Sequence, residues 1–144
     1  MRLIYILPSL IFLLFAFERC TTKEKFSYSI PSLDSTITPK KISITQLVNQ
    51  YKSLDGQYIE TEGTYFSAFE EFAIYTDKKF LSNERDGFWM DVNKNLVTDN
   101  KDWNRIDKKQ GAKILIRGRV DTASHGHLHG YLSTITNIYF FKEN

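Results

Sequence analysis

Every histidine of the chain lies in one short stretch, HGHLHG at positions 125–130. Histidines at alternate positions share one face of an extended strand, and pairs with this spacing can bind zinc. Three in a row cannot all reach one ion easily, and the two glycines of the stretch favour a turning loop. We therefore expect a loop between two strands. A metal site formed by His125, His127 and His129 is the alternative.

Acidic residues near the ends of the expected strands form a second group that could do chemistry. They are Glu70, Glu71, Glu84, Asp86 and Asp91. Paired carboxylates can carry out general acid–base catalysis, and a Glu beside a His can poise one. Charged loops at a sheet rim are usually solvated, however, and the sequence has no nucleophile elbow, phosphate-binding Gly loop or Ser–His–Asp order. We therefore expect a buried structural hydrogen bond between Glu70 and His127. We also expect that His125 and His129 can be replaced and that the protein needs no cofactor. Catalysis by Glu70 and His127 is the alternative.

Cys20 is the only cysteine and comes shortly after an uncharged apolar run, Leu3 to Phe17. A basic residue followed by such a run is typical of a secretory signal, and a spanning helix usually needs ~20 apolar residues. The position of Cys20 resembles the lipidated cysteine of bacterial lipoproteins, although Glu18 and Arg19 depart from the small residue preferred before it. We expect residues 1–20 to be a signal peptide with a lipobox-like end. An uncleaved anchor is the alternative.

The composition predicts one domain after this segment. Of 144 residues, 42% are hydrophobic and 15% aromatic, which is enough for a core. Lys and Arg number 19 and Asp and Glu number 17, so the formal charge of +2 gives no reason to expect nucleic acid as a partner. Residues 21–40 are rich in Ser and Thr and contain Pro31 and Pro39, which predicts a flexible tether before a domain at 41–144.

One helix and five strands must position the candidate residues. Four apolar residues fall on one helical stripe, Ile44, Leu47, Val48 and Tyr51. Ser43 and Gln46 fit a capping box before this stripe. A period of two then predicts strands at 57–66, 72–76, 88–92, 112–120 and 131–141. The polar stretch 93–111 has room for a short helix around Trp103 and Ile106.

Five short strands with a gap after the third are typical of a small closed barrel, because closure removes exposed edges. We therefore expect a mainly β fold, a five-stranded OB-like closed barrel with an N-terminal amphipathic helix. In this topology the first and fourth strands are neighbours. Acidic side chains of the first would then face basic ones of the fourth, Glu60 and Glu62 opposite Lys113, Arg117 and Arg119.

Aromatic residues on the second and third strands raise the question of nucleic-acid binding. OB domains can stack single-stranded bases on such side chains, here Tyr75, Phe88 and Trp89. The neighbouring loops are acidic and would repel phosphates. Aromatic residues in short strands belong more often to the core. We therefore expect these three side chains in the core and no nucleic-acid partner.

The order of short motifs resembles a group of small bacterial envelope lipoproteins with a single OB-like barrel. The motifs are DGQYIETEG, FEEFAIY, FWMD, GAKILIRGRV and GHLHGYLSTI. The resemblance covers about Ile42 to Phe141 and implies architecture and location, since members mostly have no assigned activity. Glu70 and His127 match positions of the group's motifs, whereas His129 stands where a Gly is usual.

These observations lead to one expectation about function. We expect an exported, lipid-anchored binding or structural module at the bacterial cell envelope, on the periplasmic or outer-surface side. Its partners would be the membrane, through the anchor, and an envelope protein. The alternative is a metal-binding or hydrolytic envelope protein that uses His127 and Glu70.

Overall fold

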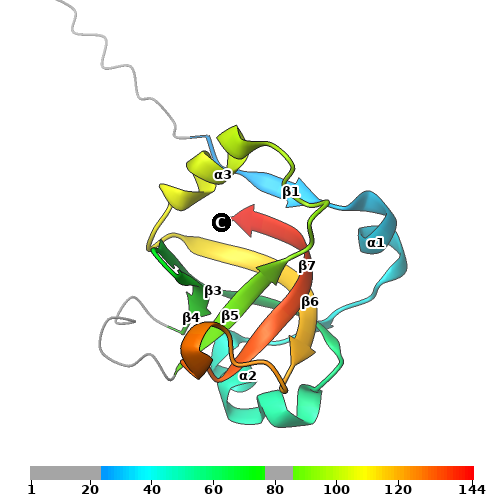
Figure 1. Cartoon of the computed structure of the whole chain (residues 1–144). Coiled ribbons are helices and arrows are strands. Elements are labelled where there is room, and N and C mark those ends of the chain that lie inside the picture. The colour runs from blue at the N-terminus through cyan, green and yellow to red at the C-terminus, as the bar shows by residue number, and fades with distance from the viewer. Residues whose placement is uncertain (1–23, 77–85) are drawn as a thin grey trace, which may run out of the picture.

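Seven strands form one mixed sheet in the computed structural model of the chain, which describes residues 24–76 and 86–144 (Figure 1). The mainly β architecture expected from the sequence is confirmed. The expected signal segment 1–20 with Cys20 lies outside the described residues, as does Glu84. Among the residues that are described, no helix is long and apolar enough to cross a membrane.

Five of the seven strands pair in a closed ring. β3 (Tyr58–Ala68) pairs antiparallel with β4 (Glu71–Tyr75), and β4 pairs antiparallel with β5 (Gly87–Val92). β5 runs parallel to β7 (Ser133–Glu143), β7 is antiparallel to β6 (Lys113–Asp121), and β6 closes the ring on β3. The five strands expected from the period-two pattern are therefore present, with ends shifted by a few residues.

Alternation along each strand sorts the side chains between the inside and the outside of the ring. In β5, Phe88 and Met90 are buried inside, whereas Trp89 is half-buried on the outer face. The expectation that Trp89 belongs to the core is therefore wrong. The register gives the reason, because Phe88 pairs with the buried Ile74 while Trp89 pairs with Ala73 on the other face of β4.

The inner side chains of all five ring strands make one core. Among them are Ile59, Tyr65, Ile74, Phe88, Met90, Ile114, Ile116, Val120, Ile135, Ile138 and Phe141. Fully burying one such aliphatic or Phe side chain contributes about 1.5–3 kcal/mol. Tyr75, which was also expected in the core, is buried but sits on the outer face of β4, opposite Gly87.

Helix α2 (Ile44–Gln50) begins at the predicted capping box. The Ser43 hydroxyl accepts a hydrogen bond from the Gln46 amide at 3.2 Å, and the Gln46 side chain accepts one from the Ser43 amide at 3.2 Å. Ile44 and Leu47 are buried, as the helical stripe predicts. A 3₁₀ helix, η1 (Tyr51–Leu54), continues the turn before β3. This helix therefore packs its apolar stripe on the core of the ring.

Helix α3 (Asn100–Asp107) lies between β5 and β6, where the sequence left room for a helix. Its first turn is capped by Asp99, whose carboxylate accepts a hydrogen bond from the Lys101 amide at 2.8 Å. Ile106 is buried, and the Trp103 ring packs edge-on against Phe72 with centroids 5.9 Å apart. The expected helix around Trp103 and Ile106 is confirmed.

The chain before residue 41 is folded from residue 24 onward, so the expected tether is wrong over 24–40. Phe26 is buried and packs edge-on against Phe141 at 5.0 Å between ring centroids. The strand β1 (Ser27–Ser29) pairs antiparallel with the end of β7. The apolar residues Phe26, Tyr28 and Ile30 alternate with Ser residues, and this short pattern provides enough buried surface to hold the segment.

Arg117 on β6 ties the short helix α1 (Pro31–Thr36) to the ring. It donates hydrogen bonds to Asp34 at 2.5 Å and to Glu60 at 2.7 Å, and its guanidinium lies 4.4 Å from the Phe140 ring centroid. Burial alone would lower the pKa of Arg117, but the hydrogen bonds that it donates to Glu60 and Asp34, together with their negative charges, outweigh burial and raise the pKa. The expected pairing of opposite charges between the two strands is confirmed for Glu60 and Arg117.

A two-residue strand, β2 (Lys40–Lys41), completes the sheet and runs parallel to β3. Lys41 lies 3.6 Å from Glu60, so this carboxylate is shared between two cations. The whole segment from Phe26 to Lys41 is therefore joined to the ring by strand pairing and by ion pairs.

Candidate functional site

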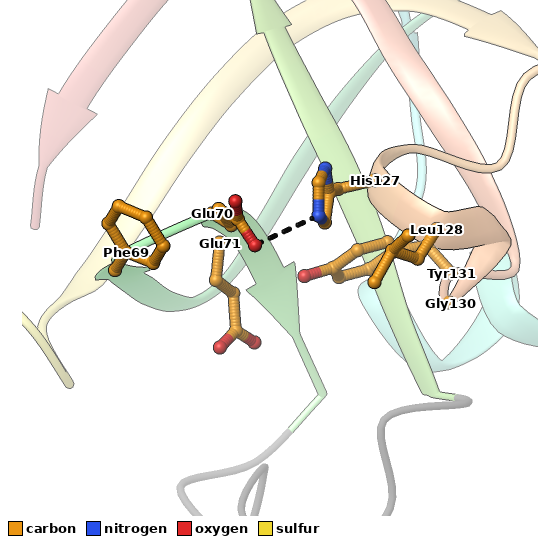
Figure 2. Close-up of a pocket in the computed structure, with 7 residues that line it drawn as sticks. All are labelled: Phe69, Glu70, Glu71, His127, Leu128, Gly130 and Tyr131. Carbon is orange, nitrogen blue, oxygen red and sulfur yellow. Dashed lines mark ion pairs between the residues drawn. The ribbon is translucent and has the colours of Figure 1, made fainter.

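Two connections of the ring meet at one rim. The first is the tight turn between β3 and β4, which holds Phe69 and Glu70. The second joins β6 to β7 and contains the 3₁₀ helix η4 (His127–His129). Figure 2 shows Glu70 and His127 pointing toward each other across the gap, with 3.2 Å between Oε2 and Nε2. The fold therefore brings together the two residues that the motif resemblance singled out.

The Glu70–His127 pair is exposed rather than buried. The Glu70 side chain is 53% exposed and that of His127 is 39% exposed. An ion pair in such a position contributes about 0–1 kcal/mol to stability. The expected contact is present, but its expected burial is wrong, because both residues lie on connections at the rim rather than on strands.

The outer histidines have different surroundings. Nδ1 of His125 lies 3.2 Å from the Tyr131 carbonyl and 3.1 Å from the Leu132 carbonyl. Carbonyl oxygens only accept hydrogen bonds, so this nitrogen carries the proton. His129 is exposed, with its ring centroid 6.2 Å from that of His125. The stretch 125–130 is thus a loop, as predicted, and His125 holds its end to the start of β7.

Among the described residues, the histidines form no metal-binding group of three or more side chains. Within residues 24–76 and 86–144, no group of three or more His, Cys, Asp or Glu side chains is placed to hold a metal ion. The Nε2 atom of His127 faces a carboxylate of the domain itself. The alternative of a three-histidine site therefore gains no geometric support from the described residues.

Backbone strain is concentrated at this rim. Three residues of this rim have a positive φ, in the left-handed region that is uncommon for residues other than Gly. They are Glu70 at 62°, Leu128 at 51° and His129 at 57°. The left-handed conformation costs roughly 1–2 kcal/mol per residue other than Gly. Gly126 also has a positive φ, and a Cβ there would lie 2.5 Å from the Cβ of Trp89. Strain of this kind clusters at ligand sites, where the surrounding structure holds it in place.

A hollow of about 240 Å³ lies between the two connections (Figure 2). It is lined by Phe69, Glu70, Glu71, His127, Leu128, Gly130 and Tyr131. Phe69 is 92% exposed and Leu128 is 84% exposed. They are the large hydrophobic side chains left exposed in the described part of the chain. Exposed apolar groups that line one hollow are typical of interaction surfaces.

Tyr75 holds Glu71, which lines this hollow, in place. The Tyr75 hydroxyl donates a hydrogen bond to Oε1 of Glu71 at 2.5 Å. The Tyr75 ring lies over Gly87, where an added Cβ would be 2.4 Å from the ring, so only glycine leaves room. Burial and the hydrogen bond to Glu71 raise the pKa of Tyr75, so the phenol stays a neutral donor. The carboxylate of Glu71 is therefore held in one orientation.

A second hollow of about 340 Å³ lies beside the first and shares His127 with it. It is lined by Trp89, Asp91, Asp121, Ser124, Gly126, His127, Thr134 and Thr136. Thr136 donates a hydrogen bond to Asp91 at 2.9 Å, and the Trp89 ring packs edge-on against Tyr131 at 5.3 Å. This hollow is a polar strip beside one aromatic ring.

Sequence reasoning missed most of this second hollow. Asp91 was among the candidate acids, but Asp121 and the hydroxyl residues Ser124, Thr134 and Thr136 were not. Single hydroxyl residues near strand ends carry no signal by themselves. The available signal was alternation, since Thr134 pairs with Trp89 across the parallel strands and faces the same side. Asp86 is exposed and lines neither hollow.

The two hollows and His127 between them form the rim site, the name used below for this surface. Its carboxylates and exposed apolar side chains come from five different parts of the chain, the β3–β4 turn, β4, β5, β6 and the β6–β7 connection. Comparison of the chain with known protein families, curated proteins and solved structures gave no match.

Proposed function

We propose that this chain is an exported, lipid-anchored domain with an OB-like barrel that acts as a binding module at the bacterial cell envelope. The pairing order of the ring supports the barrel. β3, β4 and β5 are consecutive neighbours, β7 lies between β5 and β6, and α3 precedes the fourth ring strand. This five-stranded closed order with a helix after the third strand is the one expected of OB-like domains.

The position of the rim site is the observation that carries the binding role. OB domains bind ligands on the face of their second and third strands and with the loops that join strands one to two and four to five. The five ring strands in chain order are β3, β4, β5, β6 and β7. The loops from strand one to two and from strand four to five are therefore the β3–β4 turn and the β6–β7 connection. They are the same two connections that enclose the hollow between Phe69 and Leu128 (Figure 2).

The charge of the rim site argues against nucleic acid as the ligand. Four carboxylates line its hollows, those of Glu70, Glu71, Asp91 and Asp121. Phosphate backbones are bound through Lys and Arg, and carboxylates repel them. A protein or another envelope component without phosphate groups fits this surface better.

Export and anchoring rest on the apolar run before Cys20 and on the position of that cysteine. The prediction is that Cys20→Ser releases the domain from membranes while its unfolding midpoint stays unchanged. Membrane association that persists in this variant, with an intact N-terminus by mass spectrometry, would indicate an uncleaved anchor instead.

In-cell photo-crosslinking tests the binding role. A photoreactive side chain placed at Leu128 in the full-length protein should give a discrete crosslinked product in intact cells. The same side chain at Ser35, an exposed residue of α1 away from the rim site, is the matched control. Equal products from both positions, or none from Leu128, would contradict a binding module that works through this rim.

The second candidate is a metal-binding or hydrolytic envelope protein that uses His127 and Glu70. The observation that favours it is their 3.2 Å contact, because a carboxylate can orient an imidazole for proton transfer. Zinc titration of the histidine variants described in the Discussion separates this role from the first.

A further inference from the structure

We propose that the rim site binds a cationic peptide segment that carries an apolar side chain next to its Lys or Arg. This inference rests on the proposed binding role and names the chemistry of the partner. It draws on three features of the site, which are its extent, its charge and the position of its apolar groups.

The site is long enough for a segment rather than a single small group. The two hollows adjoin at His127, which lines both. One hollow reaches to Phe69 on the β3–β4 turn, and the other reaches to Asp121 at the end of β6. An occupant of both would cross the outer face of β5 over the Trp89 side chain. An extended peptide segment has the shape that such a site requires.

The hydrogen-bonding groups of the site are mainly acceptors. Each of its four carboxylates has one oxygen bonded within the domain: Glu70 to His127, Glu71 to Tyr75, Asp91 to Thr136 and Asp121 to the Ala123 amide. These internal bonds fix the carboxylates in place. An ionised carboxylate only accepts hydrogen bonds, so an occupant must supply the donors. Ammonium and guanidinium groups do so with a charge of the complementary sign.

Apart from His127 beside Glu70, no basic side chain of the described residues lines either hollow. Among the residues of 24–76 and 86–144 that line either hollow, none is Lys or Arg. Two carboxylates line each hollow, and the hollows share His127, so the negative fields of the four groups act on the same surface. A cationic ligand is attracted by this combined negative field, whereas a neutral oligosaccharide can form only hydrogen bonds with the carboxylates.

Apolar groups flank the carboxylates at one end of the site. Phe69 and Leu128 stand on opposite sides of Glu70 and Glu71 in the first hollow (Figure 2). An apolar side chain of the partner that covers both would bury surface worth about 25 cal/mol per Å². The aromatic rings of Trp89 and Tyr131, with centroids 5.3 Å apart, add faces on which a cation can rest. This combination selects a segment that is basic and apolar at neighbouring positions.

Fluorescence of Trp89 reports occupancy directly. The chain has two tryptophans, so Trp103→Phe in the full-length protein, held in a non-ionic detergent, leaves Trp89 as the only indole. Three probes are titrated: a capped pentapeptide of alternating lysine and leucine, the same peptide with glutamate for lysine, and cellotetraose. We expect a saturable change with the lysine peptide alone. Its Kd should rise when ionic strength increases from about 0.01 M to about 0.15 M, because the screening length falls from ~30 Å to ~8 Å.

Isosteric variants locate the binding. Asp91→Asn and Glu71→Gln keep an oxygen for Thr136 and Tyr75 but remove a charge, and each should weaken the lysine peptide roughly threefold or more. Glu62→Gln, an exposed carboxylate on β3 outside both hollows, is the matched control and should change the Kd less than about twofold. Unfolding curves of each variant confirm that it is folded.

The outcomes separate this inference from the proposed binding role. Saturation by cellotetraose without the lysine peptide would overturn the cationic partner and leave the rim as a binding surface. Equal affinity for the lysine and glutamate peptides would overturn recognition by charge. The same would follow if Glu62→Gln and Asp91→Asn lost equal affinity for the lysine peptide. Failure of all three probes would also overturn the inference. The binding role itself is tested separately, by the crosslinking at Leu128.

Discussion

Histidines with identical spacing have different surroundings in the connection between β6 and β7. His125 points inward and donates to backbone carbonyls where the chain enters β7. His127 points across the rim to Glu70 and is exposed. Because Gly126 lies between them with a positive φ, the loop turns, and neighbouring imidazoles no longer share one face. The three imidazoles therefore do not share the single face that an extended strand would have given them.

The histidine contacts predict an order of stabilities. His125→Ala should lower the free energy of unfolding by about 0.5–1.5 kcal/mol, the usual contribution of a hydrogen bond. His127→Ala should cost less than about 1 kcal/mol, because its partner is exposed. His129→Ala should stay within about 0.5 kcal/mol of the wild type. Denaturant unfolding checks this order, which reverses the sequence-based expectation that His127 alone matters.

The same variants test the metal-binding candidate. Adding micromolar zinc should leave the melting temperature of the wild type unchanged. A ligand that binds only the native state raises its stability. A zinc-dependent rise that disappears in His125→Ala or His129→Ala would therefore restore the three-histidine site.

Leu128 combines backbone strain with exposure, and this combination predicts a trade-off. Asn tolerates the left-handed region better than Leu, so Leu128→Asn should raise the free energy of unfolding by about 0.5–1 kcal/mol. The same change removes the exposed apolar group and should weaken the lysine peptide. Paired unfolding and titration measurements check both effects. A more stable variant with unchanged affinity would show that Leu128 takes no part in binding.

At the scale of elements, the segment before α2 is the main difference from the sequence-based expectation. The five ring strands and α2 could be predicted because their apolar positions repeat over several periods. The alternation at Phe26, Tyr28 and Ile30 is too short to stand out among Ser and Thr residues, and its burial depends on pairing with distant β7. The sequence also did not show that Trp89 lies on the outer face of β5. Alternation divides the residues of a strand between two faces, but it does not tell which face points into the core.

Burial of Phe26 predicts that β1 is part of the folded domain. Phe26→Ala should lower the free energy of unfolding by about 3–5 kcal/mol, the range for a buried Phe. Ser27→Ala, on the exposed side of the same strand, is the matched control and should change stability by less than about 0.5 kcal/mol. A small loss in Phe26→Ala would mean that β1 is not docked and that the domain begins near residue 41.

At the scale of the whole molecule, the fold places the rim site away from the N-terminal end. In Figure 1, β1 and α3 lie at the top, where the described chain begins, and η4 lies at the bottom with α2. Six residue steps separate Cys20 from the buried Phe26, so the two Cα atoms can lie at most about 22 Å apart. A lipid on Cys20 would therefore hold the domain close to the membrane with the rim site directed away from it.

Four tyrosines that are wholly or partly buried couple the stability of the whole fold to alkaline pH. Burial is the largest cause that raises the pKa of Tyr28 to about 12 and that of Tyr65, Tyr75 and Tyr139 above the ordinary 10.0. The unfolded state releases these protons first, so stability is intact below pH 10 and falls as pH rises beyond it. Phenolate absorbance should appear together with loss of the fold. Ionisation of all tyrosines near pH 10 in the folded protein would contradict this.

If the module meets its partner at the rim site, amide hydrogen exchange should slow there when the partner is present. The measurement compares the full-length protein in isolated cell envelopes with the purified protein in detergent. We expect slowed exchange in the envelopes to be concentrated at 68–71 and 125–131, with no change in β1 or α1. Slowed exchange confined to β1 and α1, or identical exchange in both samples, would contradict it.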